Sequence, residues 1–259
     1  MTDSRSFDPA VNFYDATREF PAEVATHGIP TILDIAGPGA LILDVGTGSG
    51  RVSVPLLQHG ANLIGCDLSL KMMELLRSKY SSARLAQADA SCLPFPDHSM
   101  DALLTRHVMQ VVGPWRQALR EFQRVLKPGG VYINARSERD ETSPRRQIRN
   151  KWSQILAGRG IQEYRPGAKT AQELREGLIQ MGAECLEIPV VWHHRQQSIR
   201  SVVEGIAKRI HSGSWDIPDE VFAICLEEFL EWLKIEYPDQ NQVFAETSRF
   251  VLDVTRFPL

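Results

Sequence analysis

One short segment has residue types and a spacing suited to chemistry: residues 44–50 read Asp-Val-Gly-Thr-Gly-Ser-Gly, an acid followed by three glycines at alternate positions. The apolar residues 40–45 predict a buried parallel strand that ends in this turn. Glycine lets a backbone turn sharply and approach a ligand where any Cβ would collide. The spacing differs from the G-x-G-x-x-G of nicotinamide cofactor sites, and an acid inside the motif favours a ligand with a cationic ammonium group. The segment predicts a ligand close to a strand–helix junction, against the alternative of an ordinary flexible turn.

A second acid, Asp67, follows the next apolar stretch, residues 61–66. A carboxylate at the end of a strand can accept hydrogen bonds from both hydroxyls of a ribose. The alternative is a simple cap, since Ser69 is a good N-cap for a helix through Tyr80. The distance of Asp67 from the glycine turn favours the ribose.

Strand and helix patterns alternate from about residue 40 onward. Strands are predicted at residues 40–45, 61–66, 84–87, 101–105 and 131–135, and helices at 51–58, 69–80 and 114–126. Strands separated by helices imply parallel pairing with right-handed crossovers. The expected fold is an α/β, doubly wound open sheet with helices on both faces.

The second half of the chain is less regular. It predicts a loop with one helix in residues 137–167, helices at 171–181, 198–211 and 218–235, and strands at 184–195 and 244–257. No repeat or low-complexity linker separates these elements. We therefore expect one domain over residues 1–259: an N-terminal helical cap (1–37), a cofactor-binding core (38–136), and a remainder (137–259) with substrate-cap helices near 196–237.

Composition restricts the class of protein. Hydrophobic residues are 43% and charged residues 24% of the chain, which is typical of a globular protein. The formal net charge of −3 supplies no global basic field for nucleic acid. The four cysteines are far apart without a CxxC pair, so we expect reduced thiols and no structural zinc. The polar N-terminus is unlike a signal peptide, and no run of about 18 apolar residues predicts a membrane span. The expected location is cytoplasmic.

Five segments together resemble a known family: LDVGTGSG (43–50), CDLS (66–69), ADA (88–90), LPF (93–95) and LKPGG (126–130). As a set they are similar to the Rossmann-like (class I) S-adenosylmethionine-dependent methyltransferases, and within these to the small-molecule branch of ubiquinone/menaquinone-biosynthesis methyltransferases. The resemblance covers about residues 40–136. It implies a mostly parallel seven-stranded Rossmann-like sheet with helical cap insertions.

The resemblance also assigns the cofactor contacts. It implies that Asp44 and the turn residues Gly46, Thr47, Gly48 and Gly50 line the methionine end of S-adenosylmethionine. Asp67 would hold the ribose and Leu68 would pack against the adenine. Asp89 would bind the adenine amino group, with the backbone of Ala90 nearby, although a turn cap is the alternative role for Asp89. The Lys-Pro-Gly-Gly turn is structural in this family.

Two further segments are candidates for the site. Residues 14–18 lie in the N-terminal helical region, which in related methyltransferases folds over the cofactor. There Tyr14 would line the site and Arg18 would pair with the methionine carboxylate, or else remain a solvated arginine. Arg106 and His107 leave the fourth strand beside the first, where the sheet order reverses and ligands bind. Arg106 is a candidate cofactor contact. His107 is a candidate general base, or a residue packed beside the cofactor without proton transfer.

Aromatic residues of the second half are candidates for the acceptor site. Trp152 and Trp215, together with His107, are expected to line an apolar substrate pocket. His193 and His194 are adjacent on a predicted strand and face opposite sides, so they are poor co-ligands and we expect no metal.

The leading hypothesis is methyl transfer from S-adenosylmethionine to an O, N or C atom of an unidentified small molecule, with S-adenosylhomocysteine as product. Such an in-line displacement needs mainly alignment. The glycine spacing opposes a nicotinamide oxidoreductase. Methylation of RNA or another macromolecule remains the alternative because residues 136–149 are basic, although no Asn/Asp-Pro-Pro-Tyr-like segment follows the fourth strand. A non-catalytic S-adenosylmethionine-binding protein is the third reading. The sequence gives no oligomeric state.

Overall fold

The computed structural model describes residues 4–18 and 20–258. The chain divides into two compact units. Unit 1 contains the chain up to Ser137, residues 165–191 and the chain from Arg249; unit 2 contains residues 138–164 and 192–248. The cap helices expected near residues 196–237 fall within unit 2. The organisation of the whole chain as one domain stays a prediction.

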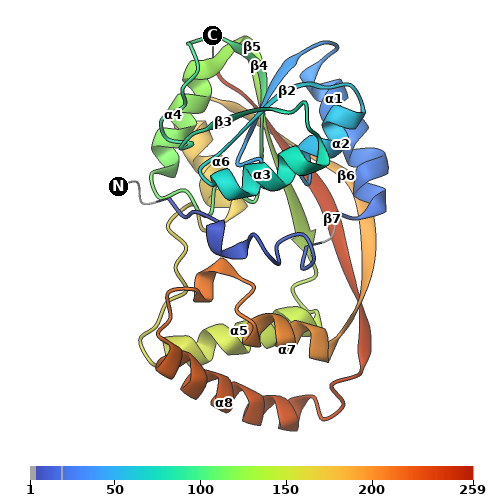
Figure 1. Cartoon of the computed structure of the whole chain (residues 1–259), viewed down its shortest axis with the longest axis vertical. Coiled ribbons are helices and arrows are strands. Elements are labelled where there is room, and N and C mark those ends of the chain that lie inside the picture. The colour runs from blue at the N-terminus through green and yellow to red at the C-terminus, as the bar shows by residue number, and fades with distance from the viewer. Residues whose placement is uncertain (1–3, 19, 259) are drawn as a thin grey trace. The chain divides into compact units, whose positions relative to one another are not determined.

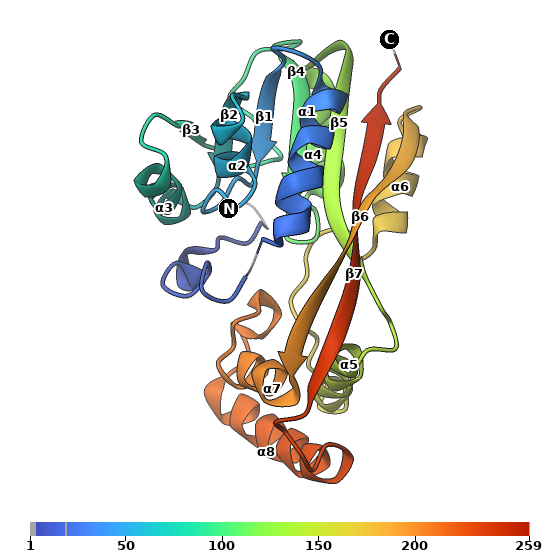
Figure 2. The ribbon, with the colours of Figure 1, turned by 90° about the vertical axis from the view of Figure 1, so that its right-hand side faces the viewer.

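A seven-stranded sheet has the order β3-β2-β1-β4-β5-β7-β6. Its strands are β1 (Leu41–Val45), β2 (Asn62–Asp67), β3 (Arg84–Gln87), β4 (Met100–Arg106), β5 (Leu126–Arg139), β6 (Glu184–Ser198) and β7 (Val243–Arg256). The strand pairs β1–β2, β1–β4, β2–β3 and β4–β5 are parallel, while β7 runs opposite to β6 (Figure 2). The chain winds outward from β1 through β2 and β3, then returns to add β4 on the other side. The predicted doubly wound, mostly parallel sheet is therefore confirmed.

Helices cover both faces of the sheet in unit 1 (Figure 1). They are α1 (Ile29–Ala36), α2 (Ser53–Gln58), α3 (Leu70–Lys79), α4 (Trp115–Val125) and α6 (Ala171–Gln180). Successive strand residues point to opposite faces, so Leu103 packs into a core with α4 and α6, and Leu104 into a core with α1 and α2. Ser69 caps α3 as predicted, because its Oγ accepts from Met72 N at 3.1 Å.

Two local expectations were wrong. The fifth strand was expected at residues 131–135, but β5 begins at Leu126 and runs through Lys-Pro-Gly-Gly. An irregularity in the β4–β5 pairing between Met100 and Ala102 accommodates the extra residues, with Gly129 at φ +79°. The N-terminal segment was expected to be helical around residues 14–18. It forms a 3₁₀ turn, η1 (Asp8–Ala10), and then turns, while a π-helical segment, η2 (Val24–Gly28), leads into α1.

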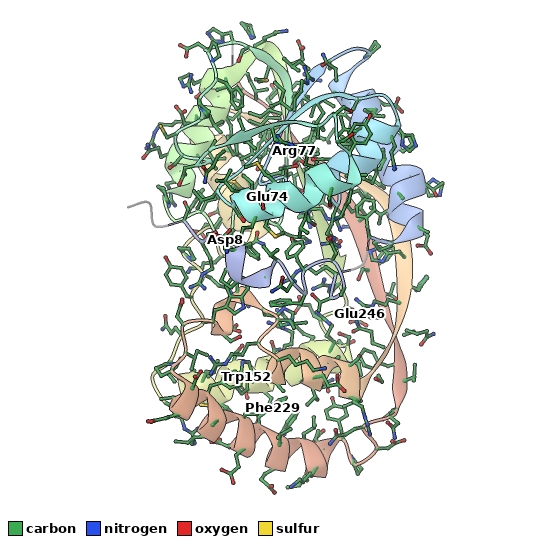
Figure 3. All side chains as sticks on the ribbon, in the orientation of Figure 1. Asp8, Glu74, Arg77, Trp152, Phe229 and Glu246 are labelled. Carbon is green, nitrogen blue, oxygen red and sulfur yellow. The ribbon has the colours of Figure 1, made fainter. Side chains whose placement is uncertain are left out.

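Unit 2 has its own apolar core. Its residues come mainly from α5 (Pro144–Ala157), α7 (Ile199–Ala207) and α8 (Asp219–Glu236), while a short 3₁₀ turn, η3 (Ser212–Ser214), lies between α7 and α8. The ring of Trp152 lies 5.2 Å from that of Phe222 and 5.6 Å from that of Phe229, centroid to centroid; Figure 3 labels Trp152 and Phe229. The helices expected in residues 137–167, 198–211 and 218–235 are confirmed. Among the described helices, none combines the length and apolar character needed to cross a membrane.

Candidate functional site

A cavity lies at the carboxyl ends of β1, β2, β3 and β4, where parallel α/β sheets bind ligands. Its volume is about 630 Å³, including its open mouth. The described residues that line it are Ser4, Arg5, Phe7, Tyr14, Val45, Gly46, Gly48, Asp67, Leu68, Met72, Ala88, Asp89, Ala90, Arg106, His107, Val108, Val111 and Val112. Segments far apart in the sequence thus share one cavity, and all of them belong to unit 1.

The glycine turn after β1 forms one wall of this cavity. Gly46 has φ +73°, and a Cβ there would stand 2.3 Å from Val108 Cγ2. Gly48 has φ +55°, and its Cβ would meet Met72 Cε at 3.7 Å, on the cavity wall. Both positions need glycine, because this backbone conformation is unfavourable for other residues. At Gly48 a side chain would occupy space that a ligand can use.

Asp67 joins the end of β2 to this turn. Its Oδ2 accepts from Gly48 N and its Oδ1 from Ser69 N, each at 2.8 Å. Burial raises the pKa of Asp67, although these backbone hydrogen bonds act to lower it. Each carboxylate oxygen can accept more than one hydrogen bond, so the group can still receive a ligand hydroxyl from the cavity.

Asp44, Thr47 and Gly50 stand behind the turn, outside the described wall of the cavity. Asp44 is 3% exposed and accepts from Ser53 Oγ, which lies 2.5 Å from Thr47 Oγ1. A Cβ on Gly50 would meet Leu76 Cγ at 2.7 Å. Burial raises the pKa of Asp44 to about 6, with Ser53 and Thr47 opposing and Asp67 contributing. In this structure the three residues support the turn from behind, and their direct contact with a ligand stays a prediction.

The residues after β2 and β3 complete a second wall. Leu68, Asp89 and Ala90 line the cavity together, as the resemblance implied they would be grouped. Asp89 Oδ1 also accepts from Ser91 N at 2.8 Å and from Ser91 Oγ at 2.6 Å. Asp89 is therefore both a turn cap and a wall residue, so the two roles considered for it are compatible.

The N-terminal segment covers part of the cavity. Asp15 accepts from Ser49 Oγ and from Lys79 Nζ, each at 2.6 Å, and Asp8 accepts from Ser69 Oγ. Arg5 N donates to Val111 O at 3.0 Å. Tyr14, from the same segment, lies in the cavity wall, and its contact with the cofactor stays a prediction.

Arg18 does not belong to the described wall. Its guanidinium lies 4.3 Å from the centre of the Tyr14 ring, and its Nη1 donates to Thr17 Oγ1 at 3.1 Å. Sequence reasoning missed Ser4, Arg5 and Phe7, which do line the cavity. One signal was available, because Phe7 is an isolated aromatic residue in a polar stretch; its ring packs edge-on to Tyr14.

The end of β4 brings Arg106 and His107 to the cavity, where their roles toward the cofactor and the acceptor stay predictions. The Arg106 guanidinium lies over the rings of Phe20 and Phe250, 4.8 and 5.4 Å from their centres. His107 is exposed and has φ +58°, an unfavourable conformation for a residue with a Cβ. Such backbone strain is concentrated at functional sites.

The two tryptophans expected in a substrate pocket lie in unit 2. Trp152 is 2% exposed within that unit's core. Its burial leaves almost no surface for a substrate, so the expectation for Trp152 is replaced by a packing role. Trp215 is half-buried, and its Nε1 donates to Arg209 O at 2.8 Å.

Comparison with known proteins points to one family. Residues 43–134 match the family model described as "Methyltransferase domain". Demethylmenaquinone methyltransferases of Renibacterium salmoninarum and Corynebacterium kroppenstedtii are 30% and 33% identical over 55% and 49% of this chain. These matches span 61% and 56% of the relatives' own length. A further relative of the same name, from Beutenbergia cavernae, is 25% identical over 81% of this chain and 80% of its own.

Solved structures share the fold. A candidate methyltransferase of Bacillus halodurans superposes with a TM-score of 0.60 at 16% identity, over 89% of this chain and 99% of its own. The [4+2]-cyclase SpnF superposes with a TM-score of 0.51 at 20% sequence identity, over 89% of this chain and 80% of the SpnF chain. The family match falls on the strands and turns that build the cavity, and these findings support the resemblance of the chain to the class I, Rossmann-like S-adenosylmethionine-dependent methyltransferases of the menaquinone/ubiquinone type.

Proposed function

We propose that this protein transfers the methyl group of S-adenosylmethionine to an oxygen, nitrogen or carbon atom of a small molecule. One observation carries the proposal: Gly46, Gly48, Asp67 and Asp89 line a single cavity at the point where the sheet order reverses. A cytoplasmic location, with a small-molecule acceptor, accompanies this proposal.

The residues of the cavity fit the cofactor. At Gly46 and Gly48 the backbone can approach a ligand closely, and a Cβ at Gly48 would enter ligand space. Asp67 offers carboxylate oxygens to ribose hydroxyls, and Asp89 offers them to the adenine amino group. Leu68 and Met72 provide apolar surface for the base. When bound, S-adenosylmethionine supplies an activated methyl group on a sulfonium.

The protein's contribution is mainly alignment and exclusion of water. Alignment of two reactants can supply about 7–11 kcal/mol of the barrier. Phe7 and Tyr14 line the cavity from the N-terminal segment, and their rings would exclude water from the part of the site that they face. Arg106 supplies positive charge on the wall, which suits the methionine carboxylate. Arg18 remains a proposed cofactor contact that would require its side chain to leave the Tyr14 ring.

His107 is the proposed general base. His107 lines the cavity, and its imidazole would accept a proton at a ring nitrogen from an oxygen acceptor. A carbon acceptor activated by neighbouring carbonyl groups would not need it. Trp215 remains a proposed acceptor contact.

Calorimetric titration tests the proposal directly. The full chain should bind S-adenosylmethionine and S-adenosylhomocysteine. Asp67→Ala should weaken binding about tenfold or more, since hydrogen bonds to charged groups contribute about 1.5–3 kcal/mol, and Gly48→Val should abolish it. Glu74→Ala is the matched control, because Glu74 is an exposed carboxylate on α3, labelled in Figure 3, outside the cavity wall.

The outcomes separate the rival functions. Absence of S-adenosylmethionine binding by the wild type would refute the proposal. Binding without transfer of a radiolabelled methyl group from the cofactor to any fraction of a metabolite extract would favour a non-catalytic binding protein. Transfer to RNA alone would favour the macromolecular alternative.

A further inference from the structure

His107 is a cavity residue whose backbone is strained. It has φ +58° and follows directly on Arg106, the last residue of β4. A residue with a Cβ keeps such a conformation only where the surrounding structure determines it. Restraints are therefore needed on the chain both after His107 and before it.

The restraint after His107 is made by backbone hydrogen bonds to the following loop. Gly167 N donates to Gln110 O at 3.1 Å, and Ala168 N donates to Met109 O at 2.9 Å. Gly167 packs so closely against the loop that a Cβ on it would lie 2.0 Å from Met109 O. Main-chain atoms thus fix the loop directly after His107.

The restraint before His107 is centred on Thr105, two positions earlier on β4. Thr105 is fully buried and stands in register with Val45 of β1 and Asn134 of β5. Its Oγ1 donates to Asn134 Oδ1 at 3.1 Å and lies 2.9 Å from the hydroxyl oxygen of Tyr132. A hydroxyl group has a single proton to donate, so Tyr132 is the donor in the second bond. Two side chains of β5 therefore hold the end of β4.

The hydrogen bonds continue from Asn134 to β7. Asn134 Nδ2 donates to Asp253 Oδ2 at 3.1 Å, and Arg136 donates to both oxygens of Asp253, from Nε at 2.8 Å and from Nη2 at 3.0 Å. An ionised carboxylate only accepts, so the amide oxygen of Asn134 must face Thr105. Burial raises the pKa of Tyr132, and its hydroxyl therefore stays a donor. The directions of these bonds form one consistent arrangement.

Packing alone does not explain these hydroxyl groups. The Tyr132 ring lies in an apolar core, 5.1 Å from the ring of Phe122, centroid to centroid. Valine at Thr105 and phenylalanine at Tyr132 would fill almost the same space. Buried polar groups whose hydrogen bonds are all made hold a segment in one arrangement, and here that segment ends at the cavity.

We propose that Thr105 and Tyr132 are positioning residues that act through His107, because their hydrogen bonds fix the carboxyl end of β4. Neither is among the described residues that line the cavity. The inference rests on the proposed function only for the part that His107 takes in the reaction. The position of the imidazole can be measured without any activity.

Nuclear magnetic resonance of the histidine rings in the full chain tests the proposal. The chain has seven histidines, and His107→Asn identifies the His107 signal by its loss, since asparagine tolerates this backbone conformation. In Thr105→Val the His107 signal should shift by more than its line width. Thr105→Ser keeps the hydroxyl and should restore the signal. Tyr132→Phe leaves the bond between Thr105 and Asn134 intact, so it should fold readily and give a smaller shift.

Thr255→Val is the matched control. Thr255 is a buried threonine on β7, 1% exposed, and its Oγ1 lies 3.7 Å from Cys185 Sγ on β6. The same substitution there should leave the His107 signal unchanged. Transfer of a radiolabelled methyl group to the extract should fall about tenfold or more in Thr105→Val, because small misplacements of reacting groups are costly, and should recover in Thr105→Ser.

Two results would overturn the proposal. One is a His107 signal that stays unchanged in both Thr105→Val and Tyr132→Phe. The other is an equal shift in Thr255→Val, because the loss of any buried hydroxyl would then have the same effect. A shifted signal with an unchanged transfer rate would support the positioning and refute His107 as the general base. If the wild type transfers no methyl group, the proposed function fails and the resonance experiment still decides this inference.

Discussion

Asp67 and Gly48 are joined by a hydrogen bond of 2.8 Å from the Gly48 amide to Oδ2 of the carboxylate. The bond connects the end of β2 to the glycine turn that follows β1, across 19 residues of sequence. Asp67 thereby holds the turn in shape while it also faces the cavity. A residue expected to bind a ribose has a second role in building the wall on the other side of the ligand.

Replacement of Asp67 by Asn removes the negative charge of the side chain and keeps its size and shape. The amide keeps one acceptor oxygen, but its NH₂ group must face either the Gly48 or the Ser69 amide. We expect a loss of about 1–3 kcal/mol in the free energy of unfolding from the unsatisfied donor, and weaker binding of S-adenosylmethionine. Urea denaturation and calorimetry measure the two effects, with Glu74→Gln as control. An Asn variant that matches the wild type in both would show that the hydrogen bond has neither role.

Asp44 makes the stability of the fold depend on pH. Its pKa rises from 3.8 in a model compound to about 6 in the fold, chiefly through burial. Between these values the folded chain holds a proton that the unfolded chain has lost, so stability falls as pH rises from about 4 to about 6 and is then level.

Asp44→Asn should remove this penalty. One pKa unit corresponds to about 1.4 kcal/mol. The free energy of unfolding of the variant should therefore exceed that of the wild type by on the order of 3 kcal/mol at most at pH 7, and by almost nothing below pH 4. Urea denaturation of both proteins between pH 3.5 and 8 measures the difference. If the difference in the free energy of unfolding between the two proteins stays constant over this range, Asp44 is not the group responsible for the pH dependence.

Local patterns predicted most of the sheet but not the contacts made by distant segments. The alternation at Leu103 and Leu104, and the regular succession of strands and helices, required only local periodicity and the crossover rule. The contact between Asp8 and Ser69 joins residues 61 positions apart. No periodicity encodes such a contact, so Ser4 and Arg5 could not be assigned to the site, and only the isolated aromatic character of Phe7 pointed to it. The inward-facing position of Asp44 was similarly hidden, because it depends on Ser53 in the following helix.

In the second half of the chain, too, the sequence pattern alone did not determine which residues pack together. Trp152 was expected in a pocket because aromatic residues often line one, yet the same side chain fills a core equally well. Only its packing against Phe222 and Phe229 decides between the two.

Lys79 should control how readily the N-terminal segment opens. Its Nζ donates to Asp15 Oδ2 at 2.6 Å and to Ser49 O at 2.7 Å, which links the segment to the glycine turn. Burial acts to raise the pKa of Asp15, but hydrogen bonds from Lys79 and Ser49 outweigh it and the pKa is lowered.

Lys79→Met should therefore accelerate dissociation of S-adenosylhomocysteine about two- to fivefold, because exposed ion pairs contribute about 0.2–1 kcal/mol. High salt should reduce the difference from the wild type. Stopped-flow displacement measures the rate. Lys71→Met, an exposed lysine on the same helix, is the control; equal acceleration in both variants would rule out a specific link.

A comparison of Gly46 with Gly39 distinguishes two reasons for a glycine at the turn: the lack of space for a Cβ and the positive φ angle. Their φ angles are +73° and +70°, but a Cβ on Gly46 would lie 2.3 Å from Val108 Cγ2, whereas one on Gly39 would meet nothing within 4 Å. Gly39→Ala should cost only the strain of a left-handed backbone, about 1–2 kcal/mol. Gly46→Ala should cost a further 1–3 kcal/mol, roughly, for the collision.

A double variant identifies the collision itself. Val108→Ala removes both methyl groups that a Cβ on Gly46 would meet. In a double-mutant cycle followed by urea denaturation, Gly46→Ala should therefore cost less in the Val108→Ala background than in the wild type. Equal costs in the two backgrounds, or equal costs for Gly46→Ala and Gly39→Ala, would show that the backbone conformation alone requires glycine. Recovery of stability without recovery of S-adenosylmethionine binding would place the added methyl group in the path of the ligand.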